Sequence, residues 1–350
     1  MLYQTENPHG GDIYGGDIRL DFSANTNPLG TPPGVLAAVS GCLQQLHRYP
    51  DPYCRELVAA IAAFERVPPE WILCGSGAAE LIYAYCTSLG RVAAVELAPT
   101  FSEYALGLHQ AGSTLVRYPL KQENAFRLDR DFLDFLQRQQ PQAVFLCNPN
   151  NPTGQVIDRE LLDAILALCK KQGIRLFLDE CFADLSDGQQ TMKDRLADSP
   201  NLLLLKAFTK SYGMAGLRLG YCLCSDAALL GKMAASVQPW NLSTPAQAAG
   251  KAALSETAFL ERTRALIAQE RPWLCRQLES LGLWVCPSQA NYLLFRGPES
   301  LGQQLRQEGI ALRSCDNYLG LGPGWYRTAV RCRRENQQLV RAVAQALGRT

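Results

Sequence analysis

Lys210, Thr209 and Arg218 have side chains that together could bind a reactive phosphorylated ring. Lys210 follows an apolar run, and Arg218 lies eight residues further on, in a turn punctuated by glycines. A lysine amine can form a Schiff base with an aldehyde, whereas a hydroxyl and a fixed guanidinium can hold a phosphate. Pyridoxal 5′-phosphate (PLP) carries an aldehyde and a phosphate on one ring, so this segment suggests a PLP site. A surface lysine beside a structural arginine is the alternative for the segment taken alone.

Asp179 and Asn151 could serve the ring of the same cofactor. Asp179 follows the predicted strand 174–178, where a carboxylate can keep a pyridine nitrogen protonated and make the ring an electron sink. A strand-end or helix-capping aspartate would look the same in isolation. Asn151 lies in the turn 148–154, whose prolines and glycine fix the backbone, so that its amide can donate to a phenolate oxygen. The Asn-Pro-Thr-Gly sequence, 25 residues before a strand-end aspartate, is a specific combination.

Two further motifs complete a candidate cofactor site. Ser76, Gly77 and Ala78 follow a predicted strand and open a helix, and backbone N–H groups at a helix N-terminus bind phosphate. A dinucleotide fingerprint would need a third glycine where Glu80 stands, so a phosphate-binding loop is the better interpretation. Phe101 follows the next predicted strand and could stack on a flat heteroaromatic ring, although a core aromatic at a helix start is at least as good an interpretation by itself.

These side chains need a rigid frame, and the hydrophobic pattern predicts an α/β fold with a largely parallel sheet covered on both faces. Short apolar runs alternate with segments of helical periodicity from about residue 72 onward. Ligands of such sheets bind at the C-terminal strand ends, where the motifs above are placed. The predicted strands are 71–74, 92–97, 114–118, 143–147, 174–178, 202–205 and 219–224, and the helices include 78–89, 104–111, 131–139 and 159–172.

The pattern changes near residue 240, which predicts a second, smaller α+β domain. A long helical stretch covers 245–281, four short strands follow at 283–286, 292–295, 310–313 and 328–332, and a final helix covers 335–347. The first 34 residues are rich in Gly, Pro and Asn and have little periodicity. We therefore expect an N-terminal arm at 1–34 that belongs to the small domain and the substrate site, a large domain at 35–240 and a small domain at 241–350.

Composition bounds the classes of function. The 350 residues carry 34 Lys and Arg against 33 Asp and Glu, and a net charge of +1 gives no reason to expect a nucleic-acid partner. No apolar run is long enough for a transmembrane helix, and the first eleven residues lack the pattern of a signal peptide. The thirteen cysteines are scattered and the three histidines lie far apart, so we expect no metal site, reduced thiols and a cytoplasmic location.

The order of these motifs resembles that of fold-type I PLP-dependent enzymes, in the branch that contains histidinol-phosphate aminotransferase and threonine-phosphate decarboxylase. The resemblance spans nearly the whole chain and implies that Lys210 is the Schiff-base lysine, Asp179 the partner of the pyridine nitrogen, Asn151 the partner of the ring oxygen and Phe101 the stacking residue. It assigns the cofactor phosphate to Ser76, Gly77, Ala78, Thr209 and Arg218. It also implies a homodimer, in which Tyr49 of Arg48-Tyr49-Pro50 reaches the neighbouring subunit's phosphate, and an α-carboxylate grip by Arg327.

Three features favour the decarboxylase side of this branch. The N-terminal segment that holds His9, Gly10, Gly11 and Asn25 resembles the start of the decarboxylases, and a histidine with free backbone N–H groups suits a small phosphorylated substrate. Phe182 stands where the aminotransferases usually carry a tyrosine. Arg313 and Arg331 add cations to Arg327, and the even spacing of Arg327 and Arg331 on a predicted strand puts both on one face, where two anions need two guanidinium groups.

The resemblance therefore implies decarboxylation of L-threonine O-3-phosphate to (R)-1-amino-2-propanol O-2-phosphate, the precursor of the nucleotide-loop linker of cobalamin. L-serine O-phosphate lacks only one methyl group, and a methyl group discriminates by only about 1–3 kcal/mol, so either substrate remains an alternative. Histidinol-phosphate aminotransferase is the second enzymatic alternative. A PLP-sensing effector without catalysis is a third, although no helix-turn-helix or basic extension is found in the sequence.

Overall fold

The computed structural model describes residues 9–14 and 16–349, and its larger unit is built on a sheet of seven strands within that part of the chain. The strand order is β2-β8-β7-β6-β5-β3-β4. Neighbours are parallel from β7 to β4, whereas β8 is antiparallel to both β2 and β7. The strands are β2 (Ile72–Gly75), β3 (Ala93–Ala98), β4 (Thr114–Pro119), β5 (Ala143–Cys147), β6 (Arg175–Asp179), β7 (Leu202–Ala207) and β8 (Gly220–Leu223). The predicted α/β class with a largely parallel sheet is confirmed.

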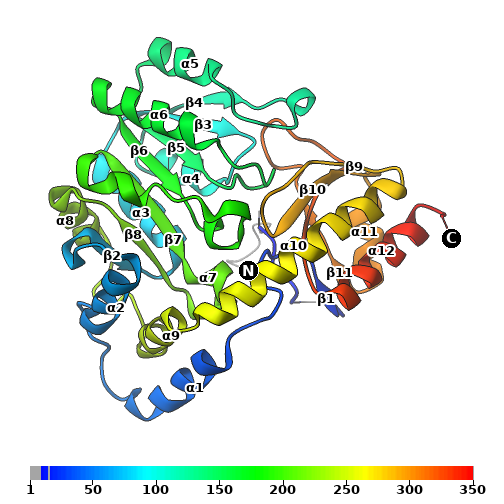
Figure 1. Cartoon of the computed structure of the whole chain (residues 1–350), viewed down its shortest axis with the longest axis horizontal. Coiled ribbons are helices and arrows are strands. Elements are labelled where there is room, and N and C mark those ends of the chain that lie inside the picture. Colours follow the sequence, from blue (N-terminus) through cyan, green and yellow to red (C-terminus); the bar gives the residue numbers. More distant parts are fainter. Residues whose placement is uncertain (1–8, 15, 350) are drawn as a thin grey trace.

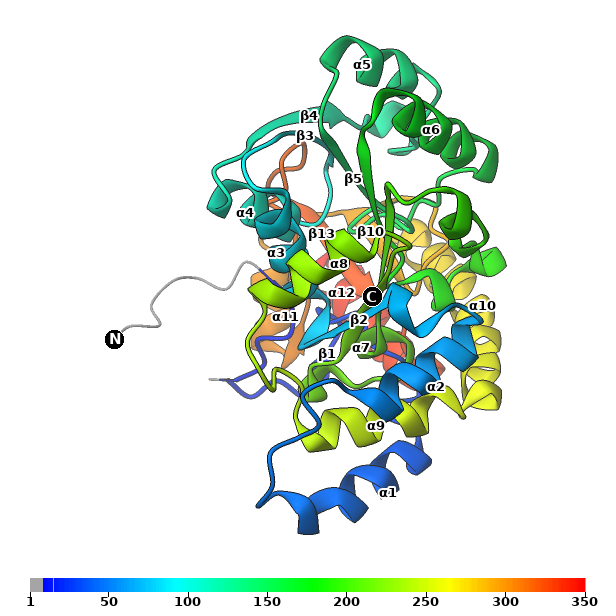
Figure 2. The same cartoon turned by 90° about the vertical axis from the view of Figure 1, so that its left-hand side faces the viewer.

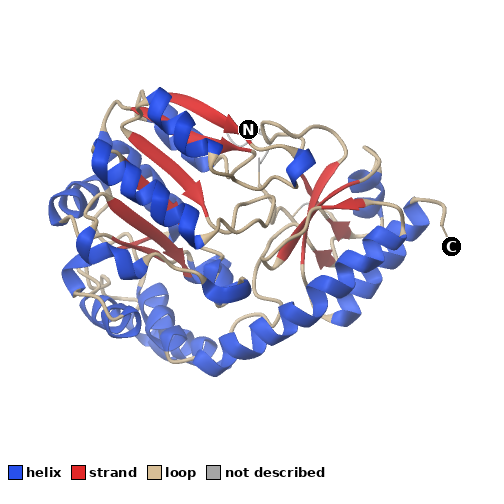
Figure 3. Ribbon diagram, turned by 45° about the horizontal axis from the view of Figure 1, so that its top comes forward, coloured by secondary structure: helices blue, strands red, loops and turns tan. Residues whose placement is uncertain are grey.

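Helices cover both faces of this sheet (Figures 1 and 3). Alternate residues of a strand point to opposite faces, so Val144 and Leu146 pack in one apolar cluster and Phe145 in another. Both clusters are buried, which explains why the central strands read as continuous apolar runs. The helices of this unit are α1 (Pro33–Cys42), α2 (Arg55–Glu65), α3 (Gly77–Leu89), α4 (Glu103–Gln110), α5 (Asp131–Gln139), α6 (Arg159–Gln172), α7 (Phe208–Ser211), α8 (Ala227–Ser236) and α9 (Thr244–Leu254).

A smaller antiparallel sheet, in the order β12-β13-β10-β9, forms the second unit. Its strands are β9 (Trp284–Val285), β10 (Tyr292–Arg296), β12 (Arg313–Ser314) and β13 (Trp325–Ala329), and its helices are α10 (Thr257–Ser280), α11 (Leu301–Gln307) and α12 (Arg333–Ala346). The N-terminal segment joins this unit, because β1 (Leu20–Asp21) pairs in parallel with β11 (Ile310–Ala311). Figures 1 and 2 show this segment and α12, the two ends of the described chain, in the same part of the molecule.

Three predicted elements differ from the structure. The predicted strand 310–313 is two short strands of different sheets, because β11 pairs with β1 whereas β12 pairs with β13. The helical stretch 245–281 is two helices, because Ser255 and Glu256 separate α9 from α10, and α9 packs against α1 and α2 of the larger unit. The predicted strand 328–332 begins three residues too late: the strand is β13, and the chain leaves it after Ala329. Cys332 then starts α12, where the side chain of Glu335 accepts from the Cys332 backbone N–H, so residues 330–332 have no place in the strand.

Within the described part of the chain, no helix combines the length and apolar character that crossing a bilayer would require. The same residues contain no group of three or more His, Cys, Asp and Glu side chains arranged to hold a metal ion.

Candidate active site

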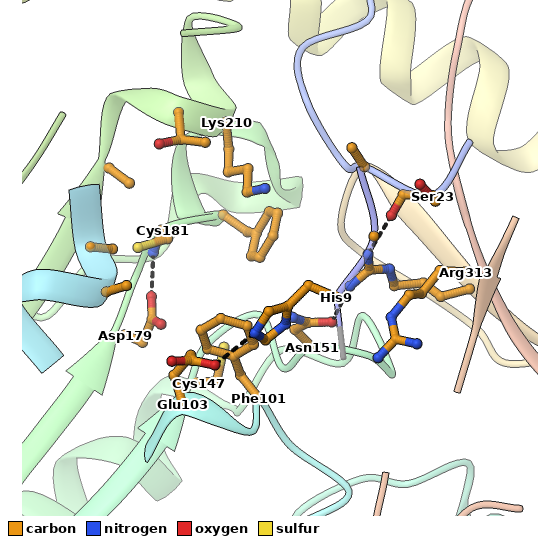
Figure 4. Close-up of a pocket in the computed structure, with 18 of the residues that line it drawn as sticks. His9, Ser23, Phe101, Glu103, Cys147, Asn151, Asp179, Cys181, Lys210 and Arg313 are labelled. Carbon is orange, nitrogen blue, oxygen red and sulfur yellow. Dashed lines mark hydrogen bonds and ion pairs between the residues drawn. The ribbon is translucent and has the colours of Figure 1, made fainter. Parts of the chain in front are cut away.

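A cavity of about 410 Å³ opens between the larger sheet and the smaller one, at the C-terminal ends of β5, β6 and β7 (Figure 4). Parallel strands collect the side chains that follow them at one edge, so residues distant in sequence meet there. Eleven of the sequence-predicted residues line this cavity: His9, Gly10, Ala78, Phe101, Asn151, Asp179, Thr209, Lys210, Arg218, Arg313 and Arg327.

Lys210 presents an amine that is poised to react near neutral pH. It lies in α7, the single helical turn that follows β7. Burial, together with the charges of Arg327 and Arg218, lowers the pKa of Lys210 to about 8, so a larger fraction of the amine is uncharged than in water. The ring of Phe182 lies 5.6 Å from the nitrogen. A partly buried lysine with a lowered pKa is suited to attack a carbonyl carbon.

Asp179 is the last residue of β6 and is almost completely buried. Its carboxylate accepts hydrogen bonds from the Tyr104 hydroxyl at 2.6 Å and the Cys181 backbone N–H at 2.9 Å. Burial raises the pKa of Asp179, and these donors and the Lys210 charge oppose that rise. A carboxylate fixed in this way can hold a positively charged N–H group in the cavity.

The start of α3 and Arg218 form a cradle for an anion. Gly77, the first residue of α3, has φ +81°, and a Cβ atom there would lie 2.6 Å from Nη2 of Arg218. Only glycine therefore lets this guanidinium approach the helix N-terminus. Ala78 and Thr209 line the cavity beside it. Helix N-termini and guanidinium groups both favour phosphate, so the cradle fits the PLP phosphate.

Arg327 and Arg313 provide a pair of guanidinium groups on the opposite wall. They stand directly across from each other on β13 and β12. Arg327 donates to Oδ1 of Asn151 at 2.6 Å and to the Ser23 carbonyl at 2.7 Å, and its buried Nε has no hydrogen-bond partner among the described residues. Arg313 donates to Oδ1 of Asn317 at 2.8 Å. Two fixed cations at one wall suit a substrate with two anionic groups.

His9 reaches the cavity from the N-terminal segment and lies beside Phe101 in its lining. Its Nε2 is 2.7 Å from Oε1 of Glu103, and its ring centroid is 5.6 Å from that of Phe101. Glu103 also accepts from the Tyr83 hydroxyl at 2.9 Å, and the hydrogen bond to His9 is the main cause of its lowered pKa. Figure 4 shows the contact between His9 and Glu103, with Phe101 beside it. The carboxylate thus ties the N-terminal segment to the first turn of α4.

Several predicted residues lie away from the cavity lining. Arg331 follows β13 instead of lying on it and forms an ion pair with Glu335 at 2.9 Å, so its predicted place on one strand face with Arg327 is wrong. Tyr49 is 79% exposed and packs on Trp240. The others are Ser76 and Gly77 at the start of α3, Gly11, whose N–H donates to the Ser23 hydroxyl, and Asn25, whose buried side chain has no hydrogen-bond partner in the described chain.

Sequence reasoning missed other residues of the site. Glu103 and Tyr104 begin α4, directly after the segment that holds Phe101, and the rings of Phe101 and Tyr104 lie 5.7 Å apart. Their closeness in sequence to Phe101 was the available signal. Tyr318 also lines the cavity, with its hydroxyl 3.5 Å from Oδ1 of Asn151. It lies in an irregular segment that carries no periodic signal. The remaining missed residues are Ser23, Ala24, Ala79, Cys147, Cys181 and Ala207, whereas Phe182, which the sequence singled out, also lines the cavity.

A sheet of this topology, with a partly buried lysine of lowered pKa, a strand-end carboxylate and an anion cradle at one edge, defines a fold-type I enzyme that uses PLP. The model of the family "Aminotransferase class I and II" matches residues 17–345, and the chain belongs to this family.

Individual relatives divide between two activities. The chain is 37% identical over 335 residues to the threonine-phosphate decarboxylase of Salmonella typhimurium, covering 95% of this chain and 92% of the relative. It is 36% identical over 345 residues to the histidinol-phosphate aminotransferase of Anaeromyxobacter sp., covering 96% and 93%. The solved histidinol-phosphate aminotransferase of Clostridium acetobutylicum is similar with a TM-score of 0.88 and 27% identity, covering 94% of this chain and 99% of that one.

PLP is the cofactor of this chain, as the sequence predicted. The residues present fit it, because Lys210 supplies the amine, Asp179 can hold the ring N–H, and the Gly77 and Arg218 cradle leaves room for the phosphate. Phe101 lines the same cavity as Asp179 and Lys210, where its ring can stack on the cofactor ring.

Proposed function

We propose that this enzyme decarboxylates L-threonine O-3-phosphate to 1-amino-2-propanol O-2-phosphate. The observation that carries the proposal is the pair Arg313 and Arg327, which line the same cavity as Lys210 from directly opposed positions of two strands. One guanidinium group for a carboxylate and one for a phosphate match a phosphorylated amino acid. The position of His9 and Gly10 in the lining and the 37% identity to a threonine-phosphate decarboxylase support the same substrate.

The residues of the chain set which bond breaks. PLP, when bound, supplies an electron sink for the electron pair of a bond at Cα, and only the bond perpendicular to the ring plane can use it. Arg327, fixed by Asn151 and the Ser23 carbonyl, can hold the carboxylate in that perpendicular position. Asp179 keeps a proton at the ring nitrogen, and the amine of Lys210 is placed to deliver a proton to Cα after CO₂ leaves.

Histidinol-phosphate aminotransferase is the second candidate, because relatives with that activity cover as much of the chain at 36% identity. It would use the same lysine to remove a proton from Cα. Phe182 lines the cavity without the hydroxyl that the aminotransferases usually offer to the ring oxygen, which favours the decarboxylase. L-serine O-phosphate stays an alternative decarboxylase substrate, because a single methyl group changes selectivity by only about 1–3 kcal/mol.

The experiment that tests the proposal measures CO₂ and glutamate in parallel. Purified PLP-loaded enzyme is incubated with L-threonine O-3-phosphate, with L-serine O-phosphate, and with histidinol phosphate plus 2-oxoglutarate. We expect CO₂ from L-threonine O-3-phosphate without glutamate from the third mixture. Glutamate without CO₂ would make the chain an aminotransferase, and a higher kcat/KM for L-serine O-phosphate would reassign the substrate.

We further propose a homodimer with shared active sites. Large apolar side chains are exposed along α1, in the segment that follows it and at Trp240: Leu36, Leu43, Leu46, Tyr49, Tyr53 and Trp240. A contiguous set of this kind is typical of an interface between copies of a chain, and closed dimers are the commonest assemblies.

The thirteen cysteines are all unpaired, which agrees with the reduced thiols proposed for a cytoplasmic enzyme.

Complementation between two inactive variants tests the shared sites. In a hybrid of Tyr49→Ala and Lys210→Ala subunits, one site combines an intact Lys210 with an intact Tyr49 from the partner. We expect Tyr49→Ala alone to have about 10- to 100-fold lower activity, because it loses one hydrogen bond to the cofactor phosphate. Random mixing should restore about a quarter of wild-type activity, since half of the dimers are hybrids with one working site. Activity that stays at the level of the separate variants, with dimers present by sedimentation, would contradict this role of Tyr49.

A further inference from the structure

A cluster of buried charges lies in the larger unit, beside the strands that carry the active-site residues. Glu65, the last residue of α2, is 2% exposed and accepts from the Tyr221 hydroxyl at 2.6 Å. Its carboxylate also lies 3.1 Å from Nζ of Lys206 and 2.8 Å from Nζ of Lys193. These contacts with the two lysines and the tyrosine outweigh burial and lower the pKa of Glu65, so it is ionised at neutral pH.

Lys206 lies at the centre of this cluster, with its side chain 8% exposed. Its Nζ is 3.9 Å from Oε2 of Glu180. The two oxygens of the Glu180 carboxylate also accept hydrogen bonds, Oε1 from the Met192 N–H at 2.8 Å and Oε2 from the Thr191 hydroxyl at 2.6 Å. Burial alone lowers the pKa of Lys206, but the carboxylates of Asp184, Glu65 and Glu180 outweigh it and raise the pKa. Lys206 therefore stays charged inside the protein.

Buried ion pairs contribute little net stability, because desolvation of the charges offsets their attraction, and a well-packed apolar core would serve as well. The positions of the partners point to another role. Glu180 directly follows Asp179 on the chain, and the neighbouring Asp184 accepts from the hydroxyl of Ser211 at 2.9 Å. Ser211 directly follows Lys210. The cluster thus contacts the chain next to both groups that serve the cofactor ring.

We propose that Lys206 is a positioning residue of the active site, which fixes Lys210 relative to Asp179 through the carboxylates of Glu65, Glu180 and Asp184. Lys206 lies on β7, four residues before Lys210, and Glu180 directly follows the last residue of the neighbouring β6. A charge between the ends of two adjacent strands resists their sliding or splaying. The proposal concerns the cofactor alone, and it holds for either decarboxylation or transamination.

The experiment compares PLP binding in Lys206→Met, Lys206→Arg and wild type, using protein from which the cofactor was removed and then titrated back. Methionine keeps the length of the side chain and removes its charge, whereas arginine keeps the charge. We expect the Kd of PLP to rise about tenfold in Lys206→Met and about threefold or less in Lys206→Arg. We also expect the pH midpoint of the absorption change of bound PLP to shift in Lys206→Met, because the amine of Lys210 and the carboxylate of Asp179 no longer keep their relative positions.

Glu270→Gln is the matched control for simple loss of a buried ion pair. Glu270 is 1% exposed in α10, where it binds Arg333 at 2.9 Å and Asn336 at 3.1 Å, and it does not line the cavity. We expect this variant to lose thermal stability and to keep the wild-type PLP affinity and spectrum. Lys206→Met with wild-type affinity and spectrum, and with a lower Tm alone, would overturn the proposal and leave the cluster a purely structural role.

Tyr221→Phe keeps the test decisive if Lys206→Met does not fold. It removes one hydroxyl from Glu65 and leaves both lysines in place. A change in PLP affinity of about two- to threefold, with the same spectral shift, is expected for this milder variant. No change in either quantity would overturn the proposal. Because the readouts are cofactor affinity and spectrum, a failed CO₂ assay with intact PLP binding would bear on the reaction alone.

Discussion

Lys210→Met is expected to reduce kcat at least about 10⁴-fold, with either a decarboxylase or an aminotransferase substrate. No other lysine lines the cavity within the described chain, and the burial that lowers the pKa of Lys210 to about 8 suits its amine to the proposed roles of nucleophile and proton donor. The measurement is single-turnover rate with saturating PLP. Lys232→Met, an exposed lysine of α8, is the control and should retain wild-type rate. A loss below about tenfold would remove Lys210 from its proposed role.

The same substitution should stabilise the cofactor-free protein. A lysine whose folded pKa lies below its unfolded value of 10.5 costs folding free energy whenever it is protonated. Between about pH 8 and 10.5 the unfolded state binds more protons than the folded state, so the wild type gains stability there and the cost disappears. Lys210→Met should therefore raise the Tm by a few degrees below about pH 8, with a smaller difference toward pH 10. This higher Tm also shows that the inactive variant is folded.

Asp179→Asn is expected to lower kcat about 10²- to 10³-fold. The amide nearly matches the carboxylate in shape, but it carries no charge to keep the ring nitrogen protonated, so the electron sink weakens. Tyr104→Phe is the graded comparison, since it removes only the 2.6 Å hydrogen bond to this carboxylate and should cost about tenfold or less. Steady-state kinetics with PLP affinity measured alongside separates loss of rate from loss of cofactor.

Equal kinetics for Asp179→Asn and wild type at full PLP occupancy would show that another group holds the ring proton. Glu180 is the next carboxylate on the chain, but it accepts from the Thr191 hydroxyl and the Met192 N–H and does not line the cavity. The comparison is therefore interpretable, because within the described residues the other carboxylate of the lining is Glu103, which is hydrogen-bonded to His9.

The larger sheet could be predicted because its central strands, β5, β6 and β7, are short apolar runs buried on both faces. Runs such as 143–147 leave few alternatives to a covered strand, and the structure places β5 at those bounds. The antiparallel direction of β8 could not be predicted, because strand direction depends on which neighbours a strand meets. The start of β13, three residues before the predicted strand, was missed for a related reason. Residues 325–329 are all buried by their partners and by packing, and no alternation marks where the strand begins.

The sequence by itself determined the residues that follow strand ends, since the C-terminal edge of a parallel sheet collects them whatever the details of packing. Asp179, Asn151 and Lys210 line the same cavity for that reason. Arg218 joins them because it precedes the antiparallel β8, whose first residue pairs with the last residue of β7. Only the tertiary structure decided contacts between distant segments. His9 contacts Glu103, 94 residues away, and Lys206 of β7 contacts Glu65 of α2. These contacts depend on how whole elements pack together. Local periodicity records which face of an element is buried, and it contains no information on which partner covers that face.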